Sequence, residues 1–154
     1  IKSTSFWLMK SELASLIYNK ALDILSRREH SKQELKLKLS AKFEDINLIR
    51  EVIDRLEKNN LLNDYRFAEM YVSIRKRKGF GPKRISYELS NKGIEESVSN
   101  QIISAEGAWE DAALMVFKKK YKEGISEDTK VKLKQKSFLQ NRGFSFKEIE
   151  SVFG

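Results

Sequence analysis

The chain has 154 residues, of which 34% are charged, and a formal net charge of +8 at pH 7. It has no cysteine, one histidine and no apolar run near the roughly 20 residues of a membrane span, which excludes disulfides, thiolate metal sites and histidine metal clusters. We therefore expect a soluble cytoplasmic protein that has no membrane contact, metal or cofactor.

Apolar residues recur along the chain with a period of fifty. Leu39, Leu89 and Leu139 lie at this interval, and each is followed three positions later by a cation. The same period aligns Ile17 with Phe67 and Phe117, Val52 with Ile102 and Val152, and Ile53 with Ile103 and Phe153. Such a period is typical of repeat arrays, which form elongated binding surfaces more often than enzymatic clefts. Because helix breakers are rare, we predict an all-α fold of three tandem three-helix repeats, with units similar to helix-turn-helix modules.

The first predicted repeat covers residues 12–60, and it follows a segment, residues 1–11, for which we predict no structure. Apolar residues at helical spacing predict helices over about residues 12–29, 31–41 and 45–59. Ser31 and Glu34 have the spacing of a capping box, in which each side chain bonds the backbone amide of the other residue. The second helix is therefore expected to begin at this point.

The second predicted repeat covers residues 61–106. Asp64 is expected to cap its first helix, since a short polar side chain can accept from the amides of the first turn. Pro82 suits the start of the second helix, where no amide hydrogen is needed, and Gly93 can end that helix with a positive φ. The third helix is predicted over residues 95–104.

The third predicted repeat covers residues 107–154. Its helices are expected over about residues 108–122, 126–141 and 145–153. Gly143 takes the place that Gly93 has one period earlier, and Ser145 with Glu148 forms a second capping-box pattern.

Basic residues are concentrated in two segments. Residues 71–92 contain seven cations and one anion, and residues 117–142 contain nine cations and three anions. Residues 93–111 contain five anions and no cation. This pattern favours a basic stripe that meets a polyanion or an acidic protein groove, although a solvated face that only maintains solubility has the same composition.

The sharpest local candidate is the run from Arg75 to Arg84, in which four consecutive cations end one helix. Lys83 and Arg84 then occupy the first turn of the next helix, where the helix dipole disfavours cations. Their placement beside exposed backbone amides predicts that they take up an anion. The sequence Gly79-Phe80-Gly81 is not a nucleotide-binding loop, because no strand precedes it and no Gly-Lys-Ser/Thr follows.

Signals for catalysis are weak. His30 lies next to a capping serine without a nucleophile motif, and we expect it on the surface. The acidic residues lack the paired spacing of an acid/base or metal site. We therefore predict that the chain is not an enzyme and has no catalytic or metal-binding residues, with a nuclease or hydrolase as the remote alternative.

Several segments together resemble the bacterial RecX regulators. They are Leu61-Leu62-Asn63-Asp64-Tyr65-Arg66-Phe67-Ala68, the run from Arg75 to Ile85, Lys92-Gly93-Ile94, Ser31-Lys32-Gln33-Glu34-Leu35, and Arg142-Gly143-Phe144. The resemblance covers roughly residues 17–153 and leaves out residues 1–11. It implies a curved, elongated array of three-helix repeats, in agreement with the period of fifty.

The resemblance to RecX also implies a function. Members of that family bind filaments of the RecA recombinase on DNA and suppress ATP hydrolysis, strand exchange and the co-protease activity that triggers the SOS response. We accordingly expect a monomer whose partners are the RecA filament and single-stranded DNA. The expected contact residues are Arg75, Lys76, Arg77, Lys78, Lys83, Arg84, Lys92 and Arg142. The alternative is a helical repeat protein that binds nucleic acid without sequence preference.

Overall fold

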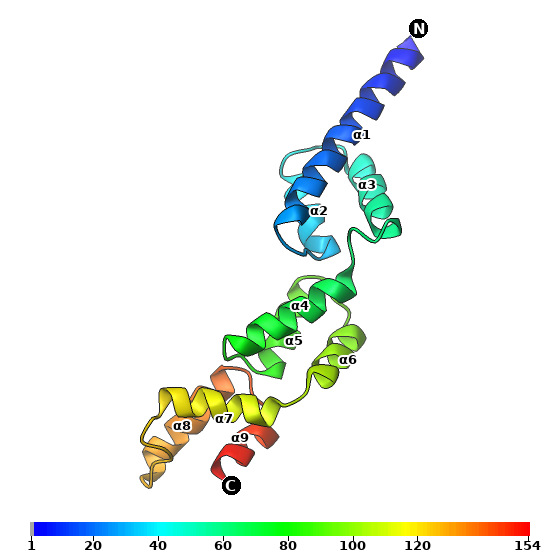
Figure 1. Ribbon diagram of the computed structural model, residues 1–154. Coiled ribbons are helices and arrows are strands. Elements are labelled where there is room, and N and C mark those ends of the chain that lie inside the picture. The colour runs from blue at the N-terminus through cyan, green and yellow to red at the C-terminus, as the bar shows by residue number, and fades with distance from the viewer. Residues whose placement is uncertain (1) are drawn as a thin grey trace. The chain divides into compact units, whose positions relative to one another are not determined.

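The computed structural model describes residues 2–154, and it describes side chains from Met9 onwards. Within this range the chain forms helices and no strand, which confirms the all-α prediction (Figure 1). The helices are α1 (Lys2–Arg27), α2 (Lys32–Ser40), α3 (Ile46–Lys58), α4 (Asp64–Arg77), α5 (Pro82–Asn91), α6 (Glu96–Glu106), α7 (Trp109–Lys120), α8 (Thr129–Asn141) and α9 (Phe146–Phe153). They follow one another as three sets of three. The chain divides into two compact units, with the boundary after Phe67.

The first unit holds α1, α2 and α3 around one apolar core. Its fully buried side chains include Ile17, Leu35, Leu39, Ile49 and Leu56. The predicted capping box is present: the Ser31 hydroxyl accepts from the Glu34 amide at 3.1 Å, and the Glu34 carboxylate accepts from the Ser31 amide at 3.1 Å. These bonds satisfy amides that have no partner within the helix, so α2 begins where the sequence predicts.

The first helix is longer than predicted, because α1 begins at Lys2 and not near residue 12. The prediction followed the apolar stripe, and among the side chains that the structure describes, packing against the core begins at Leu13 and Ala14. Nothing in the sequence before them breaks a helix, since no proline or glycine occurs among the first eleven residues. The residues that precede the stripe therefore continue the helix.

The start of α4 differs from the prediction in its capping residue. The side chain of Asn63, and not that of Asp64, accepts from the amide of Arg66 at 3.0 Å. The Asp64 carboxylate instead accepts from the amide of Lys32, at the start of α2, at 2.7 Å. Burial raises the pKa of Asp64 above its ordinary value, although the Lys32 amide acts in the opposite direction.

The period of fifty corresponds to equivalent buried positions. Leu39, Leu89 and Leu139 each have an exposed fraction of 0%. In each repeat the carbonyl of this leucine accepts a backbone hydrogen bond from the turn that follows: from Phe43 at 2.9 Å, from Ile94 at 3.1 Å and from Phe144 at 3.2 Å. The equivalent leucine therefore belongs to the core and closes the turn in each of the three repeats.

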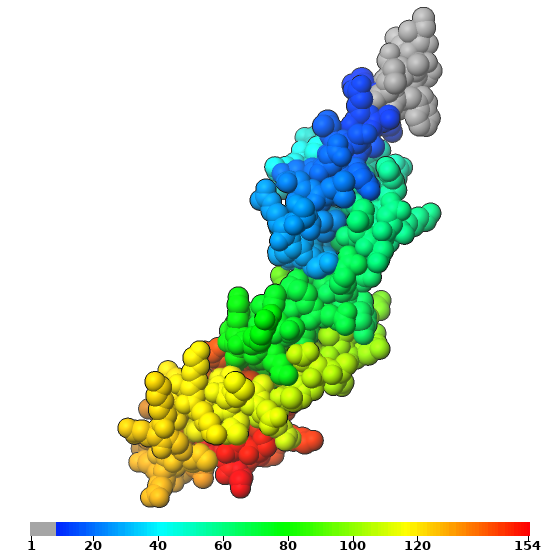
Figure 2. Space-filling model, viewed as in Figure 1, coloured from blue at the N-terminus to red at the C-terminus, as the bar shows by residue number. Residues whose placement is uncertain are grey.

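In the third repeat α7 contacts both α8 and α9, and the three helices pack together at the C-terminal end of the chain (Figure 2). The capping box of Ser145 and Glu148 is present at α9. Helix α8 begins at Thr129, three residues later than predicted, because the side chain of Asp128 caps it and the buried side chain of Gln135 bonds the preceding loop. Its amide oxygen accepts from the Ser126 amide and its nitrogen donates to the Gly124 carbonyl, both at 3.1 Å.

Candidate functional site

The turn between α4 and α5 docks through its backbone on the turn that follows α8. The amide of Gly81 donates to the carbonyl of Arg142 at 2.7 Å, and the amide of Lys83 donates to the carbonyl of Gly143 at 2.9 Å. Pro82 has no amide hydrogen to offer. The prediction that Lys83 and Arg84 hold an anion with these amides is therefore wrong, because backbone carbonyls already occupy the amides of Gly81 and Lys83.

Three arginines surround the ring of Phe80 at this turn. The guanidinium carbons of Arg75, Arg84 and Arg142 lie 3.9, 4.4 and 4.9 Å from the ring centroid. Such cation–π contacts hold the charged groups against the aromatic face and restrict their freedom to reach a partner. Three of the predicted contact residues therefore lie together, but as part of the packing of the second unit.

Glu88 neutralises much of this arginine cluster. Its carboxylate accepts from Arg75 in a bidentate pair at 2.9 and 2.8 Å, from Arg84 at 3.3 Å and from the Tyr71 hydroxyl at 2.8 Å. Burial acts to raise the pKa of Glu88, but the hydrogen bonds from Arg75, Tyr71 and Arg84 together hold it below its ordinary value. The carboxylate is therefore ionised at neutral pH and fixes Arg75 in place.

Lys76 and Lys92 also make contacts within the second unit. The Lys76 ammonium donates to the carbonyl of Gly107 at 2.8 Å, and it lies 3.7 Å from Glu106 and 5.2 Å from the Trp109 ring centroid. The Lys92 ammonium lies 5.5 Å from the ring centroid of Tyr71. The side chain of Lys76 is only 19% exposed, so its position suits a structural role.

Arg77, Lys78 and Lys83 are the predicted contact residues that are exposed and lie outside the arginine cluster. Arg77 and Lys78 line a groove of about 750 Å³ that is formed by the end of α4 together with α7 and α8. Its lining also includes the cations Lys119, Lys120 and Arg142, and the apolar side chains of Ala112, Met115 and Val116. This surface can offer charge and apolar contact to a partner at the same time.

The sequence did not identify the α7 side of this groove. Lys119 and Lys120 belong to the second basic segment, residues 117–142. The excess of cations in that segment was the signal that could have identified them. Met115 gave no signal, because an apolar residue at helical spacing usually belongs to the core. In the structure its side chain is 73% exposed.

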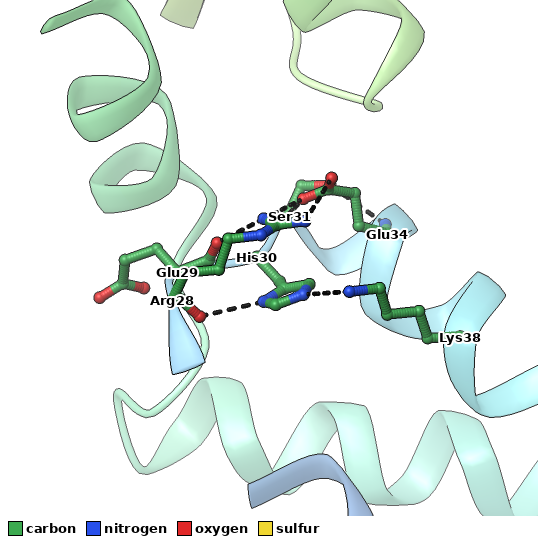
Figure 3. A network of polar contacts seen from close by, with 6 residues as sticks. All are labelled: Arg28, Glu29, His30, Ser31, Glu34 and Lys38. Atoms are coloured by element: carbon green, nitrogen blue, oxygen red, sulfur yellow. Dashed lines mark hydrogen bonds and ion pairs between the residues drawn. The ribbon is translucent and has the colours of Figure 1, made fainter. Parts of the chain in front are cut away.

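His30 is buried, with an exposed fraction of 1%, so the prediction of a surface histidine is wrong. Figure 3 shows the polar contacts of its ring. Its Nδ1 lies 3.0 Å from the carbonyl of Arg28, and its Nε2 lies 2.7 Å from the ammonium of Lys38. Because an ammonium group only donates, Nε2 accepts and Nδ1 carries the proton. Burial lowers the pKa of His30, and the cations Arg28 and Lys38 lower it further, although the Arg28 carbonyl acts to raise it. The neutral imidazole thus links two basic residues of the first unit.

Among the residues that the structure describes, no three histidine, cysteine or acidic side chains come together as a metal site. Over the same part of the chain, none of the helices is both long and apolar enough to cross a membrane.

Three consecutive three-helix repeats with equivalent core positions define a tandem helical-repeat protein, and its second compact unit carries a basic groove. Family models agree with this division: the first, second and third three-helix domains of RecX match residues 18–56, 63–102 and 109–153. The chain belongs to the RecX family.

Individual relatives show the same relationship. The chain is 35% identical over 133 residues to regulatory protein RecX of Halorhodospira halophila, which covers 86% of this chain and 83% of that protein. It is also 35% identical to regulatory protein RecX of Pseudomonas tolaasii, with 86% of each chain covered.

Solved structures extend the likeness to the fold. The crystal structure of RecX from Lactobacillus salivarius matches with a TM-score of 0.79 and 27% identity over 93% of this chain and 96% of that one. A second RecX crystal structure matches with a TM-score of 0.84 over 99% of this chain and 77% of that chain, at 19% identity.

Proposed function

We propose that this chain binds filaments of the RecA recombinase on DNA and inhibits the recombinase, ATPase and co-protease activities of RecA. In this way it modulates recombination and the SOS response. Membership of the RecX family supports the proposal, and the relatives carry the name of regulatory proteins. In this proposal the chain acts by binding and not by catalysis.

The observation that carries the proposal is the groove of the second unit and its exposed cations. Arg77, Lys78, Lys119 and Lys120 have long, exposed side chains beside apolar groups, which suits an acidic protein surface next to a phosphate backbone. Arg75, Lys76 and Arg84 make internal contacts, and we assign them the role of holding this surface in shape. Lys83 adds a further exposed cation at the start of α5.

The test compares two variants with equal loss of charge. Arg77→Glu with Lys78→Glu reverses the groove cations, whereas Lys118→Glu with Lys147→Glu reverses two exposed cations of the same unit outside the groove. Arg77 and Lys118 each lie in the last turn of a helix, where the dipole disfavours glutamate, whereas Lys147 lies in the first turn of α9, where glutamate is favoured. Circular dichroism therefore checks that both variants keep their helices. The measured quantity is the ATPase activity of RecA on single-stranded DNA, with RecA in excess so that the DNA is fully covered.

We expect the unchanged chain to inhibit at substoichiometric amounts and the control variant to do the same. An opposite-charge pair at 4 Å contributes about 1 kcal/mol in water, so two reversals should raise the half-inhibitory concentration at least about tenfold for the groove variant. If the unchanged chain leaves the covered filament unaffected and only sequesters free strands, the RecA proposal fails. Nonspecific binding of nucleic acid is then the better account.

A further inference from the structure

The first unit contains a second concave surface, a cavity of about 470 Å³ formed by α1, α2 and the ends of their connecting turns. Five cations and one carboxylate line it: Lys20, Arg27, Arg28, Lys38, Lys42 and Asp23. The sequence shows no basic run here, because these cations are spread from residue 20 to residue 42. Folding of α1 against α2 brings them to one place.

The carboxylates nearby satisfy only part of this charge. Asp23 is shared, since it lies 3.6 Å from Lys20 and 3.5 Å from Arg27. Arg28 pairs with Glu34 through two bonds of 3.2 Å. Among the described side chains, no carboxylate lies within 4.0 Å of the ammonium groups of Lys38 and Lys42.

Like charges meet inside the cavity. Lys20 and Lys42 line the same cavity, and the nearby charge of Lys20 lowers the pKa of Lys42, with Arg27 acting in the same direction. Cations that line one cavity repel each other, and an anion bound between them relieves this repulsion. Side chains this long have other rotamers available, so their convergence is the arrangement that a bound anion stabilises.

The buried imidazole of His30 positions one of these cations. Its Nε2 accepts from Lys38 at 2.7 Å, while Nδ1 donates to the Arg28 carbonyl at 3.0 Å (Figure 3). The Lys38 ammonium has two further hydrogens for another acceptor. His30 thus fixes Lys38 at the wall of the cavity without neutralising it.

We propose that this cavity binds a phosphate group. A carboxylate is flat and is matched by the fork of a single arginine, and Glu34 already occupies the fork of Arg28. The remaining donors are the ammonium groups of Lys20, Lys38 and Lys42 and the guanidinium of Arg27, which come from separate elements around a concave surface. Such an arrangement suits the oxygens of a tetrahedral anion. The phosphate can belong to a nucleic acid backbone or to a small phosphate compound, and the proposal does not depend on RecA.

The single histidine of the chain allows a direct test by proton NMR. At pH 8, where an imidazole is neutral, the Hε1 signal of His30 is followed during titration with inorganic phosphate and, separately, with sodium chloride at matched ionic strength. The cavity variant is Lys20→Gln with Lys42→Gln. The control variant is Arg50→Gln with Lys58→Gln, which removes two exposed cations of α3 outside the cavity.

We expect phosphate to shift the signal in a saturable way in the unchanged chain and in the control. The cavity variant should bind phosphate roughly tenfold more weakly, because two nearby charges are lost. Circular dichroism checks that both variants keep their helices. A signal that moves no more in phosphate than in chloride overturns the proposal, and so does a phosphate shift that the cavity variant retains in full.

A second measurement identifies the source of the phosphate. Binding of single-stranded DNA is measured by fluorescence anisotropy over a salt series with the same two variants. If the cavity takes a backbone phosphate, the cavity variant should flatten the slope of log affinity against log salt by about 0.7, the contribution of one contact, relative to the control variant. An equal slope in both variants, together with the NMR result, assigns the cavity to a small phosphate compound.

Discussion

Alanine substitutions at three glycines distinguish two effects on the free energy of unfolding: the effect of a left-handed backbone and the effect of a steric clash with a neighbouring turn. At Gly143, φ is +100°, and an added Cβ would lie 2.3 Å from the Cβ of Arg84. At Gly81, φ is −94°, which other residues adopt, but a Cβ would lie 2.4 Å from the carbonyl carbon of Gly143. At Gly124, φ is +89°, and no heavy atom lies within 4 Å of the Cβ position.

The expected costs follow from these geometries. Gly124→Ala forces alanine into a left-handed backbone, which costs roughly 1–2 kcal/mol. The smaller conformational freedom of alanine in the unfolded chain offsets part of this cost, so we expect the free energy of unfolding to fall by about 1 kcal/mol. Gly81→Ala separates the two docked turns and breaks two backbone hydrogen bonds, each contributing about 0.5–1.5 kcal/mol, which predicts about 1–3 kcal/mol. Gly143→Ala combines both effects and should cost about 2–4 kcal/mol.

Trp109 provides the assay, because it lies in α7 of the second unit and is 9% exposed. A Trp7→Phe background leaves it as the only tryptophan of the chain. Its fluorescence during urea unfolding then gives the free energy of unfolding of the unit that contains both docked turns. If Gly143→Ala costs no more than Gly124→Ala, the two turns do not touch in solution, and the close docking of Gly81 on Gly143 is wrong.

Three further predictions concern the core, the buried histidine and the groove. Leu39→Ala, Leu89→Ala and Leu139→Ala should each lower the free energy of unfolding by about 2–5 kcal/mol in urea titrations, and a change below about 0.5 kcal/mol at one site would refute its equivalence to the others. Because the pKa of His30 is lowered in the folded chain, the unfolded chain binds the proton first as pH falls through about 6.5. Unfolding measured at pH 8 and pH 5.5 should therefore show a loss of stability on acidification that is smaller in His30→Gln. Arg77→Gln with Lys78→Gln should flatten the salt slope for single-stranded DNA by about 1.4, two contacts of about 0.7 each; an unchanged slope in anisotropy measurements removes the pair from the DNA contacts.

The repeat and its helix ends could be predicted because their signals are local in the sequence. Leu39 and its two counterparts recur at a fixed interval, and a capping box needs only residues three apart. The start of α1 could not be predicted from the apolar stripe, because a helix can continue beyond the part that packs on the core. The cap of α4 was misassigned to Asp64, whose carboxylate bonds an amide 32 residues earlier.

The roles of individual cations depend on partners that are distant in the sequence. Lys76 donates to a carbonyl 31 residues away, and Arg142 lies over the ring of Phe80. A count of charges cannot distinguish such residues from Arg77 or Lys78, which have the same chemistry and are exposed. Conversely, the cavity of the first unit has no basic run, so the sequence did not point to it. The packing of the helices determines which cations make contacts within the protein and which remain exposed on its surface.

The segment from Arg75 to Lys78 serves the fold and the proposed contact surface at once. The side chains of Arg75 and Glu88 are only 20% and 19% exposed, and removal of one partner of a buried pair costs about 3–5 kcal/mol at the fully buried limit. Substitution of the exposed Arg77 and Lys78 should change stability by no more than about 0.5 kcal/mol. A variant that neutralises all four cations would therefore lose binding through unfolding as well as through charge. We expect a stable fold with impaired binding only when Arg75 and Lys76 are kept and Arg77 and Lys78 are replaced. A variant that stays folded and yet binds poorly is the evidence that the groove itself contacts the partner.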